Sequence, residues 1–224
     1  MAIMVPGEIE REHAVSLFDN GTAVVFGFNN ARAYTDINTS SDAASAYGTL
    51  QSLGYDSTLM FDAEPQDAYA CLPGSTIFYF TGHGSSGYIK FADGYFLGAK
   101  RGNGGYYWAP CYISDLHDGS LSGTKLIVLN SCSGATGNES TGNMLDMLVS
   151  KGAGTAIGFR HDIGESQGNY WGKMFFKHMS RGCTADEASR NACKDVYLRF
   201  IGFTGNVTEQ NIVIKGDSGL KIAG

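Results

Sequence analysis

The chain has 224 residues, of which 43% are apolar, and it carries a formal net charge of −6 with a pI near 5.3. This length and apolar content can supply the core of one large domain, and we expect residues 22–224 to form it behind an N-terminal arm over residues 1–21. The acidic balance argues against nucleic acid or an anionic membrane as a partner, because both require a basic surface.

The cysteines and the N-terminal residues bear on the cellular compartment. The five cysteines are odd in number and none shows C-x-x-C spacing, which favours neither a disulfide framework nor a zinc site. We therefore expect no metal, no cofactor and a reducing compartment. The first twenty residues lack a secretory leader's apolar core, and no later run approaches the roughly eighteen apolar residues of a membrane span. Unless a leader precedes residue 1, we expect a cytoplasmic protein without membrane contact; its oligomeric state stays open.

Apolar runs and turn residues predict alternating strands and helices in the first part of the chain. Ser40 and Ser41 offer a helix N-cap, and Asp42 would place a negative charge in the first turn, where the helix dipole favours it. Strands that alternate with helices at this spacing indicate βαβ units and a mainly parallel sheet. The expected elements are strands at 22–28, 57–61 and 75–81 and helices at 43–53 and 65–71.

The pattern changes after residue 81. Asp93-Gly94 lies between two short apolar runs and predicts a β-hairpin over 88–97, since this pair tolerates the positive φ values of a two-residue turn. A glycine-rich loop over 98–110 carries three adjacent aromatic residues, 106–108. The remaining expected elements are strands at 126–129 and 155–159, helices at 143–151, 167–180 and 184–200, and a second hairpin over 211–222. The whole order predicts an α/β fold.

Two of the predicted strands are unbroken apolar runs, which is typical of strands buried on both faces of a parallel sheet. One is followed by Gly82-His83-Gly84, and the other by Asn130-Ser131-Cys132. If these strands are parallel neighbours, His83 and Cys132 emerge at the same edge of the sheet, where open α/β sheets bind ligands. Alone, each residue is more often structural, the cysteine as a small apolar core residue. Together they predict a catalytic dyad.

Such a dyad has a defined chemistry. A free thiol with a pKa of about 8.5 is mostly protonated at neutral pH, so an adjacent imidazole takes its proton and later returns it to a leaving amine. Gly84 would let the backbone turn sharply and present its N–H to a substrate oxygen. The N–H of Cys132 would be the second donor of an oxyanion hole. An ordinary tight turn would give the same residues, and the sequence does not separate the two.

These motifs resemble those of the caspase-like cysteine peptidases of clan CD, which include caspases, metacaspases, clostripain, gingipains and CHAT domains. A buried strand that ends in His-Gly is followed 49 residues later by one that ends in Ser-Cys-Ser-Gly, close to the spacing of about 50 in caspases. The resemblance implies a three-layer α/β/α sandwich with added β-hairpins. It also implies hydrolysis of a peptide or protein substrate through a thioester on Cys132. The sequence holds no metal-binding motif, and only the resemblance leaves calcium dependence open, because some relatives use calcium.

The residue before the scissile bond would bind beside the cysteine. Because residues two apart on a strand share a face, Asn130 should point into that pocket next to Cys132. Metacaspases and clostripain carry Asp there, which pairs with Arg or Lys of the substrate. Asp42 resembles a second acidic pocket residue of metacaspases and would favour a basic substrate residue, although its position equally suits the helix dipole. Asp162 and Glu165 are weaker candidates.

A domain of another functional class is compatible with the same sequence. A caspase-like domain that no longer cuts would act as a protein-interaction module, and Asn130 in place of Asp leaves this alternative open. The presence of both His83 and Cys132 favours the peptidase. We therefore predict a cysteine endopeptidase with His83 and Cys132 as the catalytic pair, the amides of Gly84 and Cys132 as oxyanion donors, and Asn130 and Asp42 in the specificity pocket.

Overall fold

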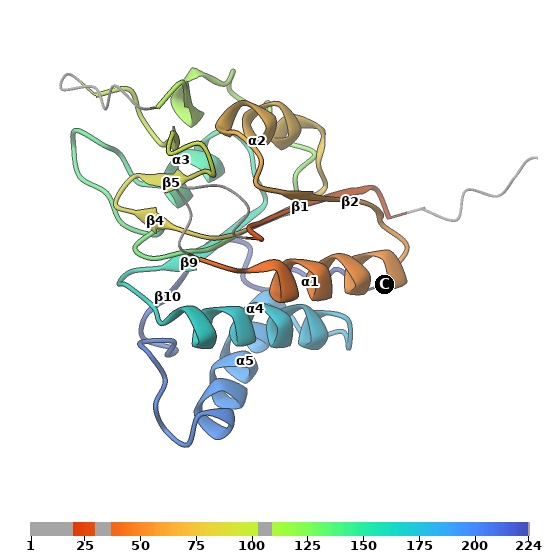
Figure 1. The fold of residues 1–224 in the computed structure, drawn as a ribbon. Coiled ribbons are helices and arrows are strands. Elements are labelled where there is room, and N and C mark those ends of the chain that lie inside the picture. Colours follow the sequence, from red (N-terminus) through yellow and green to blue (C-terminus); the bar gives the residue numbers. More distant parts are fainter. Residues whose placement is uncertain (1–19, 30–36, 103–108, 224) are drawn as a thin grey trace, which may run out of the picture.

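A computed structural model describes residues 20–29, 37–102 and 109–223, so most of the predicted arm and the three aromatic residues at 106–108 lie outside the described residues. A six-stranded sheet in the order β10-β9-β8-β3-β1-β2 runs through the molecule (Figure 1). All neighbouring strands are parallel except β10, which is antiparallel to β9. The strands are β1 (Thr22–Gly27), β2 (Asp56–Phe61), β3 (Ile77–Thr81), β8 (Leu126–Asn130), β9 (Thr155–Phe159) and β10 (Ile212–Gly216). The predicted parallel α/β sheet is confirmed.

The central strands are buried on both faces, as their unbroken apolar runs predict. Every residue of β3, β8 and β9 is buried, whereas the edge strand β2 is exposed at Asp56, Thr58 and Phe61. Alternation places Tyr79 on one face of the sheet, and Phe78 and Phe80 on the other. Parallel strands need cover on both faces, so the sheet lies between two further layers.

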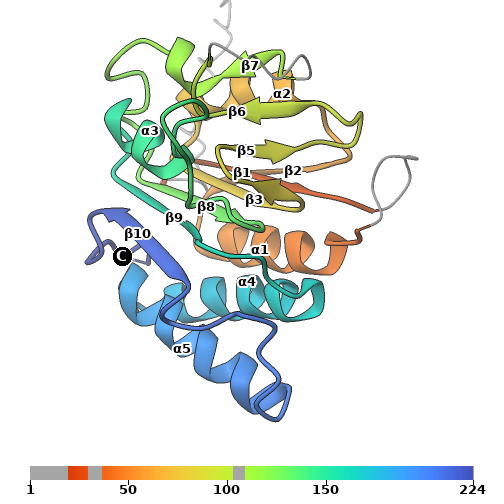
Figure 2. The ribbon, with the colours of Figure 1, turned by 90° about the vertical axis from the view of Figure 1, so that its left-hand side faces the viewer.

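One layer consists of helices α1 (Ser40–Ser52), α4 (Glu165–Met179) and α5 (Ala185–Arg199), which lie together below the sheet in Figures 1 and 2. Trp171, Phe175 and Phe176 of α4 are fully buried and pack with Tyr79 and other residues of that face. The side chain of Asn143 caps the N-terminus of a helix on the other face, α3 (Met144–Ser150), and α2 (Pro65–Cys71) lies there too. None of the helices in the described ranges is both long and apolar enough to cross a membrane.

A second, four-stranded sheet covers the same face as α2 and α3 (Figure 2). Its strands are β4 (Gly84–Ser85), β5 (Tyr88–Lys90), β6 (Phe96–Gly98) and β7 (Cys111–Tyr112). Strands β5 and β6 pair in an antiparallel hairpin whose turn contains Gly94 at φ +86°, which confirms the predicted hairpin. This sheet is built from the segment between His83 and Cys132.

Two local predictions are wrong. The predicted hairpin over 211–222 is a single strand, β10, which pairs with β9 at the register Ile214 to Ile157; within the described residues no strand follows Gly216. Its partner is distant in sequence, and alternation alone cannot tell a distant partner from a near one. The N-cap predicted at Ser40 or Ser41 is the second wrong prediction, because helix α1 begins at Ser40 and its N-cap is Thr39. The Thr39 hydroxyl makes no capping bond and donates instead to the carbonyl of Thr81 over 2.9 Å.

Candidate active site

The ends of β3 and β8 bring His83 and Cys132 to the same cavity. Thr81 and Asn130 are register partners at the ends of the two strands, and the N–H of Gly82 donates to the carbonyl of Asn130 over 3.2 Å. His83 and Cys132 each lie two positions beyond this pair, and both line one cavity of about 170 Å³. The predicted adjacency of the two strands is therefore confirmed, and it puts a thiol and an imidazole in one hollow at the carboxyl edge of the sheet.

Cys132 lies in a sharp turn that the next residue makes possible. Ser133 has φ +51°, a region that non-glycine residues occupy uncommonly and often at functional sites. Its N–H donates to the carbonyl of His161 over 3.3 Å, and its hydroxyl donates to a carboxylate oxygen of Asp162 over 2.9 Å. These bonds to the loop after β9 hold the turn in place and leave Cys132 at its start.

Gly84 lies directly against the turn that carries Cys132. A Cβ built on Gly84 would come within 2.8 Å of the Cys132 carbonyl oxygen and within 2.8 Å of the Ser131 Cβ. Only a residue without a side chain allows the two backbones to approach so closely. The backbones of Gly84 and Cys132 are thus neighbours, and the Cys132 backbone atom that lies against Gly84 is the carbonyl oxygen.

The sulfur of Cys132 is held by the backbone of Ile163, in the loop between β9 and α4. The N–H of Ile163 donates to Sγ over 3.4 Å, and Sγ lies 3.6 Å from the Ile163 carbonyl oxygen. Burial raises the pKa of the Cys132 thiol, the bond from the Ile163 N–H lowers it, and the charge of Asp162 raises it; the net shift is upward. The sulfur therefore rests as a thiol at neutral pH and needs a base to become a nucleophile.

Asn130 lines the cavity and belongs to a buried polar cluster. Its side chain is 3% exposed, and it lines the cavity with Cys132 and His83. The amide nitrogen Nδ2 has four acceptors, namely Asp42 Oδ2 at 3.1 Å, the Tyr79 hydroxyl at 3.1 Å, Thr81 Oγ1 at 3.3 Å and the Gly168 carbonyl at 2.9 Å. The reverse orientation of the amide would point its oxygen at a carboxylate and a carbonyl, so this one is favoured.

The oxygen of the Asn130 side-chain amide differs from the nitrogen in its hydrogen bonding. Asn130 Oδ1 is buried and accepts no hydrogen bond from any residue in the described ranges. A buried acceptor without a donor costs free energy, and the side chain that carries this one lines the cavity. Asn130 thus holds the polar cluster with its amide donors, while its amide oxygen is buried next to the cavity.

Asp42 belongs to this cluster but does not line the cavity. It lies in the first turn of α1, almost completely buried, and the Tyr79 hydroxyl donates a short hydrogen bond to its Oδ2. Burial raises the pKa of Asp42 to about 7, although hydrogen bonds from Tyr79, Thr81 and Asn130 lower it. Burial and the adjacent carboxyl group raise the pKa of Tyr79 well above its ordinary value. The Asp42 charge therefore depends on pH around neutrality, and Asn130 separates it from the cavity.

Two glycines on one face of α4 make room for the cluster. A Cβ on Gly172 would collide with the Tyr79 hydroxyl and lie 2.6 Å from Asp42 Oδ1, and one on Gly168 would lie 3.4 Å from Asn130 Oδ1. Sequence reasoning missed Gly168, Gly172 and Tyr79. The signal that was available is a pair of glycines four residues apart inside a helix, where glycine normally costs stability.

The two weaker acidic candidates lie at different places. Glu165 lines the cavity, and its carboxylate accepts a hydrogen bond from the N–H of Asn38 over 3.2 Å. Asp162 lines a neighbouring hollow instead, and it accepts the Ser133 hydroxyl. Nowhere in the part of the chain that the structure describes do three His, Cys, Asp or Glu side chains gather as they would around a metal ion.

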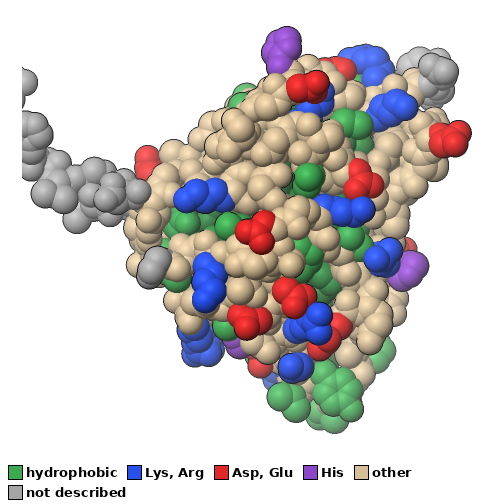
Figure 3. Space-filling model, turned by 180° about the vertical axis from the view of Figure 1, so that it is seen from behind, with side chains coloured by type: hydrophobic (Ala, Val, Ile, Leu, Met, Phe, Trp, Pro, Cys, Tyr) green, Lys and Arg blue, Asp and Glu red, His purple; other side chains and the backbone are tan. Residues whose placement is uncertain are grey.

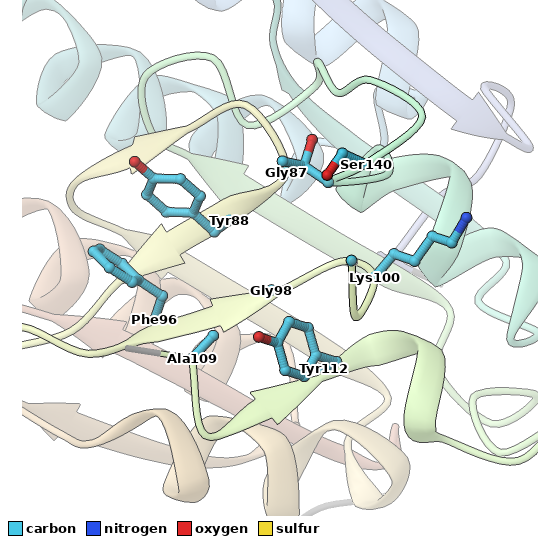
Figure 4. A pocket seen from close by; sticks show the side chains of 10 residues that line it. Gly87, Tyr88, Phe96, Gly98, Lys100, Ala109, Tyr112 and Ser140 are labelled. Atoms are coloured by element: carbon cyan, nitrogen blue, oxygen red, sulfur yellow. The ribbon is translucent and has the colours of Figure 1, made fainter. Parts of the chain in front are cut away.

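A separate slot lies between the small sheet and the loop after Cys132 (Figure 4). Tyr88, Phe96 and Tyr112 line it together with Lys100 and the backbone of Gly87 and Gly98. Its free volume is about 20 Å³, close to that of a single water molecule. Among the described residues, its lining holds no thiol and no imidazole. The cavity beside Cys132 is therefore the better candidate for chemistry.

Comparison with solved structures finds the same fold in three cysteine peptidase systems. Gingipain R (RgpB) of Porphyromonas gingivalis, an Arg-specific cysteine proteinase, matches 92% of this chain and 48% of its own, with a TM-score of 0.67 and 13% identity. Separase in the separase–securin complex of Saccharomyces cerevisiae matches 88% of this chain and 12% of its own, with a TM-score of 0.53 and 13% identity. Caspase-1 from Spodoptera frugiperda matches 88% of both chains, with a TM-score of 0.52 and 12% identity.

These similarities show the fold of the chain. No family model matches the sequence, and no curated protein is significantly similar to it. The chain spans about half the length of the gingipain structures it matches. The predicted caspase-like three-layer α/β/α fold is confirmed.

Proposed function

We propose that the chain is a cysteine endopeptidase with Cys132 as nucleophile and His83 as general acid and base. One observation carries this proposal: the two residues follow a pair of register partners at the ends of adjacent parallel strands, and both line one cavity. The fold, shared with cysteine peptidases at low sequence identity, supports it.

In the proposed reaction His83 takes the proton of the Cys132 thiol, and the sulfur attacks the carbonyl carbon of the substrate peptide. The N–H groups of Gly84 and Cys132 donate to the oxyanion of the tetrahedral intermediate. This intermediate collapses as His83 gives its proton to the leaving amine, which breaks the C–N bond and leaves a thioester on Cys132. Water, deprotonated by His83, then hydrolyses the thioester and restores the thiol. The raised pKa of Cys132 explains why a base is needed.

The cavity supports a preference for a basic residue before the scissile bond. Asn130 Oδ1 is a buried acceptor without a partner among the described residues, and Glu165 adds a carboxylate to the lining. Asp42 acts from behind Asn130, since its carboxylate polarises the amide that faces the substrate. Asn130 and Asp42 would then set the preference together, with Asp42 as a positioning residue.

Cleavage of a fluorogenic peptide library tests the function. The library varies the residue before the scissile bond, and the wild type is compared with Cys132→Ala and with Cys183→Ala, which removes a half-buried cysteine outside the cavity. We expect the wild type and Cys183→Ala to cut peptides with Arg or Lys at that position, and Cys132→Ala to lose at least a thousandfold in kcat/KM. The assay is run with and without calcium, because the proposal needs none. Full activity of Cys132→Ala would rule the proposal out.

A protein-interaction module that does not cut is the alternative, with a protein partner in place of a substrate. The hydrogen bond from Ile163 to the Cys132 sulfur and the raised thiol pKa favour it, because both suit an inert cysteine. Covalent labelling separates the two functions. A peptidyl chloromethyl ketone with Arg at the reactive end should label Cys132 of the wild type much faster than that of His83→Ala, as measured by mass spectrometry. An inert cysteine would show no such difference.

We also propose that the protein works in the cytoplasm. All five cysteines are free, which suits a reducing compartment. Fractionation of the producing cells with an antibody against the chain tests this, and recovery only from the extracellular fraction would contradict it.

A further inference from the structure

Large apolar side chains are exposed at the C-terminal end of α5. Leu198 is 73% exposed, Ile201 95% and Phe203 74%, and with Tyr197 these are the most exposed large apolar residues in the described ranges. Figure 3 shows hydrophobic side chains gathered at the lower end of the molecule, where α5 and the turn after it lie in Figure 1. We call Leu198, Ile201 and Phe203 the α5 apolar surface. A contiguous exposed surface of this kind is typical of a binding site.

The exposed side chain of Ile201 lies on a strained backbone. Ile201 has φ +54°, in the left-handed region, which is a true outlier for a β-branched residue. In return the side chain gains almost no burial, since nearly all of it faces water. The folded chain alone therefore gives no reason for isoleucine at this position, whereas an apolar ligand would.

The turn after α5 is bonded to the loop that holds the Cys132 sulfur. The N–H of Gly164 donates to the carbonyl of Gly205 over 2.8 Å, and the side chain of Asn206 donates to the carbonyl of Asp162 over 3.0 Å. A groove of about 400 Å³ runs between the turn after α5 and the loop between β9 and α4. Its lining includes Phe203, Ile163 and Gly164. Ile163 and Gly164 also line the cavity beside Cys132, so the groove adjoins that cavity, and Phe203 is the member of the α5 apolar surface that lines the groove.

The order of the strands decides which part of a substrate reaches this groove. His83 follows β3, on one side of β8 and Cys132, whereas the loop with Ile163 and Gly164 follows β9, on the other side. His83 protonates the leaving amine, so the substrate downstream of the scissile bond must lie on the β3 side. The residues upstream of the bond must then leave the cavity on the β9 side, toward the groove.

We propose that the α5 apolar surface binds apolar side chains of the substrate in the few residues before the scissile bond. This proposal rests on the proposed peptidase function. The preferred substrates are then segments in which apolar residues precede a basic residue at the cleavage position.

Paired peptides test the proposal. Both members carry Arg before the scissile bond; one has Leu and Phe upstream of it and the other has Ser in their place. The wild type is compared with Ile201→Asn, which suits the left-handed backbone, and with Phe203→Ser. Tyr95→Ser, which removes a partly exposed aromatic residue in the β5–β6 hairpin, is the matched control. Thermal unfolding checks that each variant folds, and we expect a higher Tm for Ile201→Asn because the strained β-branched residue is gone.

We expect the ratio of kcat/KM for the apolar peptide to that for the polar peptide to fall about tenfold in Ile201→Asn and Phe203→Ser, mainly through KM. Tyr95→Ser should keep the wild-type ratio. An unchanged ratio in both folded variants, or a wild type that cuts both peptides equally well, would overturn the proposal. Loss of self-association in these variants with an unchanged ratio would overturn it in favour of a second copy as the occupant.

A binding measurement separates this proposal from the peptidase function. Fluorescence anisotropy of both labelled peptides is measured with Cys132→Ala and with Cys132→Ala/Ile201→Asn, neither of which can cut. Tighter binding of the apolar peptide that depends on Ile201 supports the surface even if the wild type proves inactive. Equal binding of both peptides to Cys132→Ala would contradict it even if the wild type is a peptidase.

Discussion

The amide nitrogen of Asn130 lies 3.1 Å from Oδ2 of Asp42 and separates that carboxyl group from the cavity beside Cys132. An amide thus lines the cavity, and the acid lies behind it. Burial raises the pKa of that acid to about 7, so its charge depends on pH near neutrality. Stability and substrate preference should both depend on this arrangement.

The first prediction concerns the pH dependence of stability. The folded-state pKa of Asp42 is raised, so between pH 4 and 7 the folded state binds more protons than the unfolded state, and stability falls as the pH rises. Asp42→Asn is neutral at every pH and keeps an oxygen to accept the bonds of Tyr79 and Asn130. Its free energy of unfolding should match that of the wild type near pH 4 and exceed it by up to about 4 kcal/mol at pH 8, which corresponds to the rise from 3.8 to about 7. Urea denaturation across this range measures the difference, and a constant difference at all pH values would contradict the account.

The second prediction exchanges the positions of the acid and the amide. Asn130→Asp alone places its new carboxyl group as close to that of Asp42 as the hydrogen-bonded amide of Asn130 lies now. This variant should therefore be strongly destabilised at pH 8 and less so at pH 5. The double variant Asp42→Asn/Asn130→Asp keeps one acid and one amide but moves the charge to the cavity. In the double variant, the ratio of kcat/KM for peptides with Arg before the scissile bond to that for peptides with Gln should be about tenfold higher than in the wild type. The reason is that a charged acceptor binds a cation more strongly than an amide does. Equal preferences in wild type and double variant would show that this position does not contact the substrate.

The third prediction compares two helical glycines. Gly172→Ala adds a methyl group where the Tyr79 hydroxyl and Asp42 already lie, so the free energy of unfolding should fall by about 1–3 kcal/mol despite the better helix propensity of alanine. Gly48 of α1 is exposed and has no heavy atom within 4 Å of the added methyl group. Gly48→Ala should therefore raise stability by about 0.5–1 kcal/mol. Chemical denaturation of both variants gives the comparison, and equal shifts would mean that the cluster tolerates the methyl group.

The parts of the molecule that sequence predicts well are those encoded within short segments. The buried strands β3 and β8 are continuous apolar runs, and the residues that follow them at the sheet edge can be named before their partners are known. The placement of His83 and Cys132 at one edge follows from the parallel order alone. Their roles in catalysis stay predictions.

The parts that sequence predicts poorly depend on contacts between layers. In the sequence, Asp42 suits either the acidic first turn of a helix or a specificity pocket. Only the packing of α1 against α4 reveals that it is buried behind Asn130. Tyr79 reads as one more aromatic residue of a strand, although its hydroxyl bonds to Asp42. The sequence predicts a near partner for β10, whereas its partner is β9, because alternation carries no information on distance along the chain.

The pairing of β3 with β8 has a consequence for how the chain folds. In the six-stranded sheet, the partners in the parallel pairs lie between 29 positions apart, as for Leu126 and Thr155, and 54 positions apart, as for Ala23 and Ile77. Such non-local contacts form slowly because long loops must close before any pairing is gained, whereas helices form from neighbouring residues within microseconds. His83 and Cys132 meet only when one of these loops, 49 residues long in sequence, has closed. During refolding the helical circular dichroism signal should therefore return well before the proposed peptidase activity, and we expect a newly synthesised chain to lack that activity until its sheet is complete.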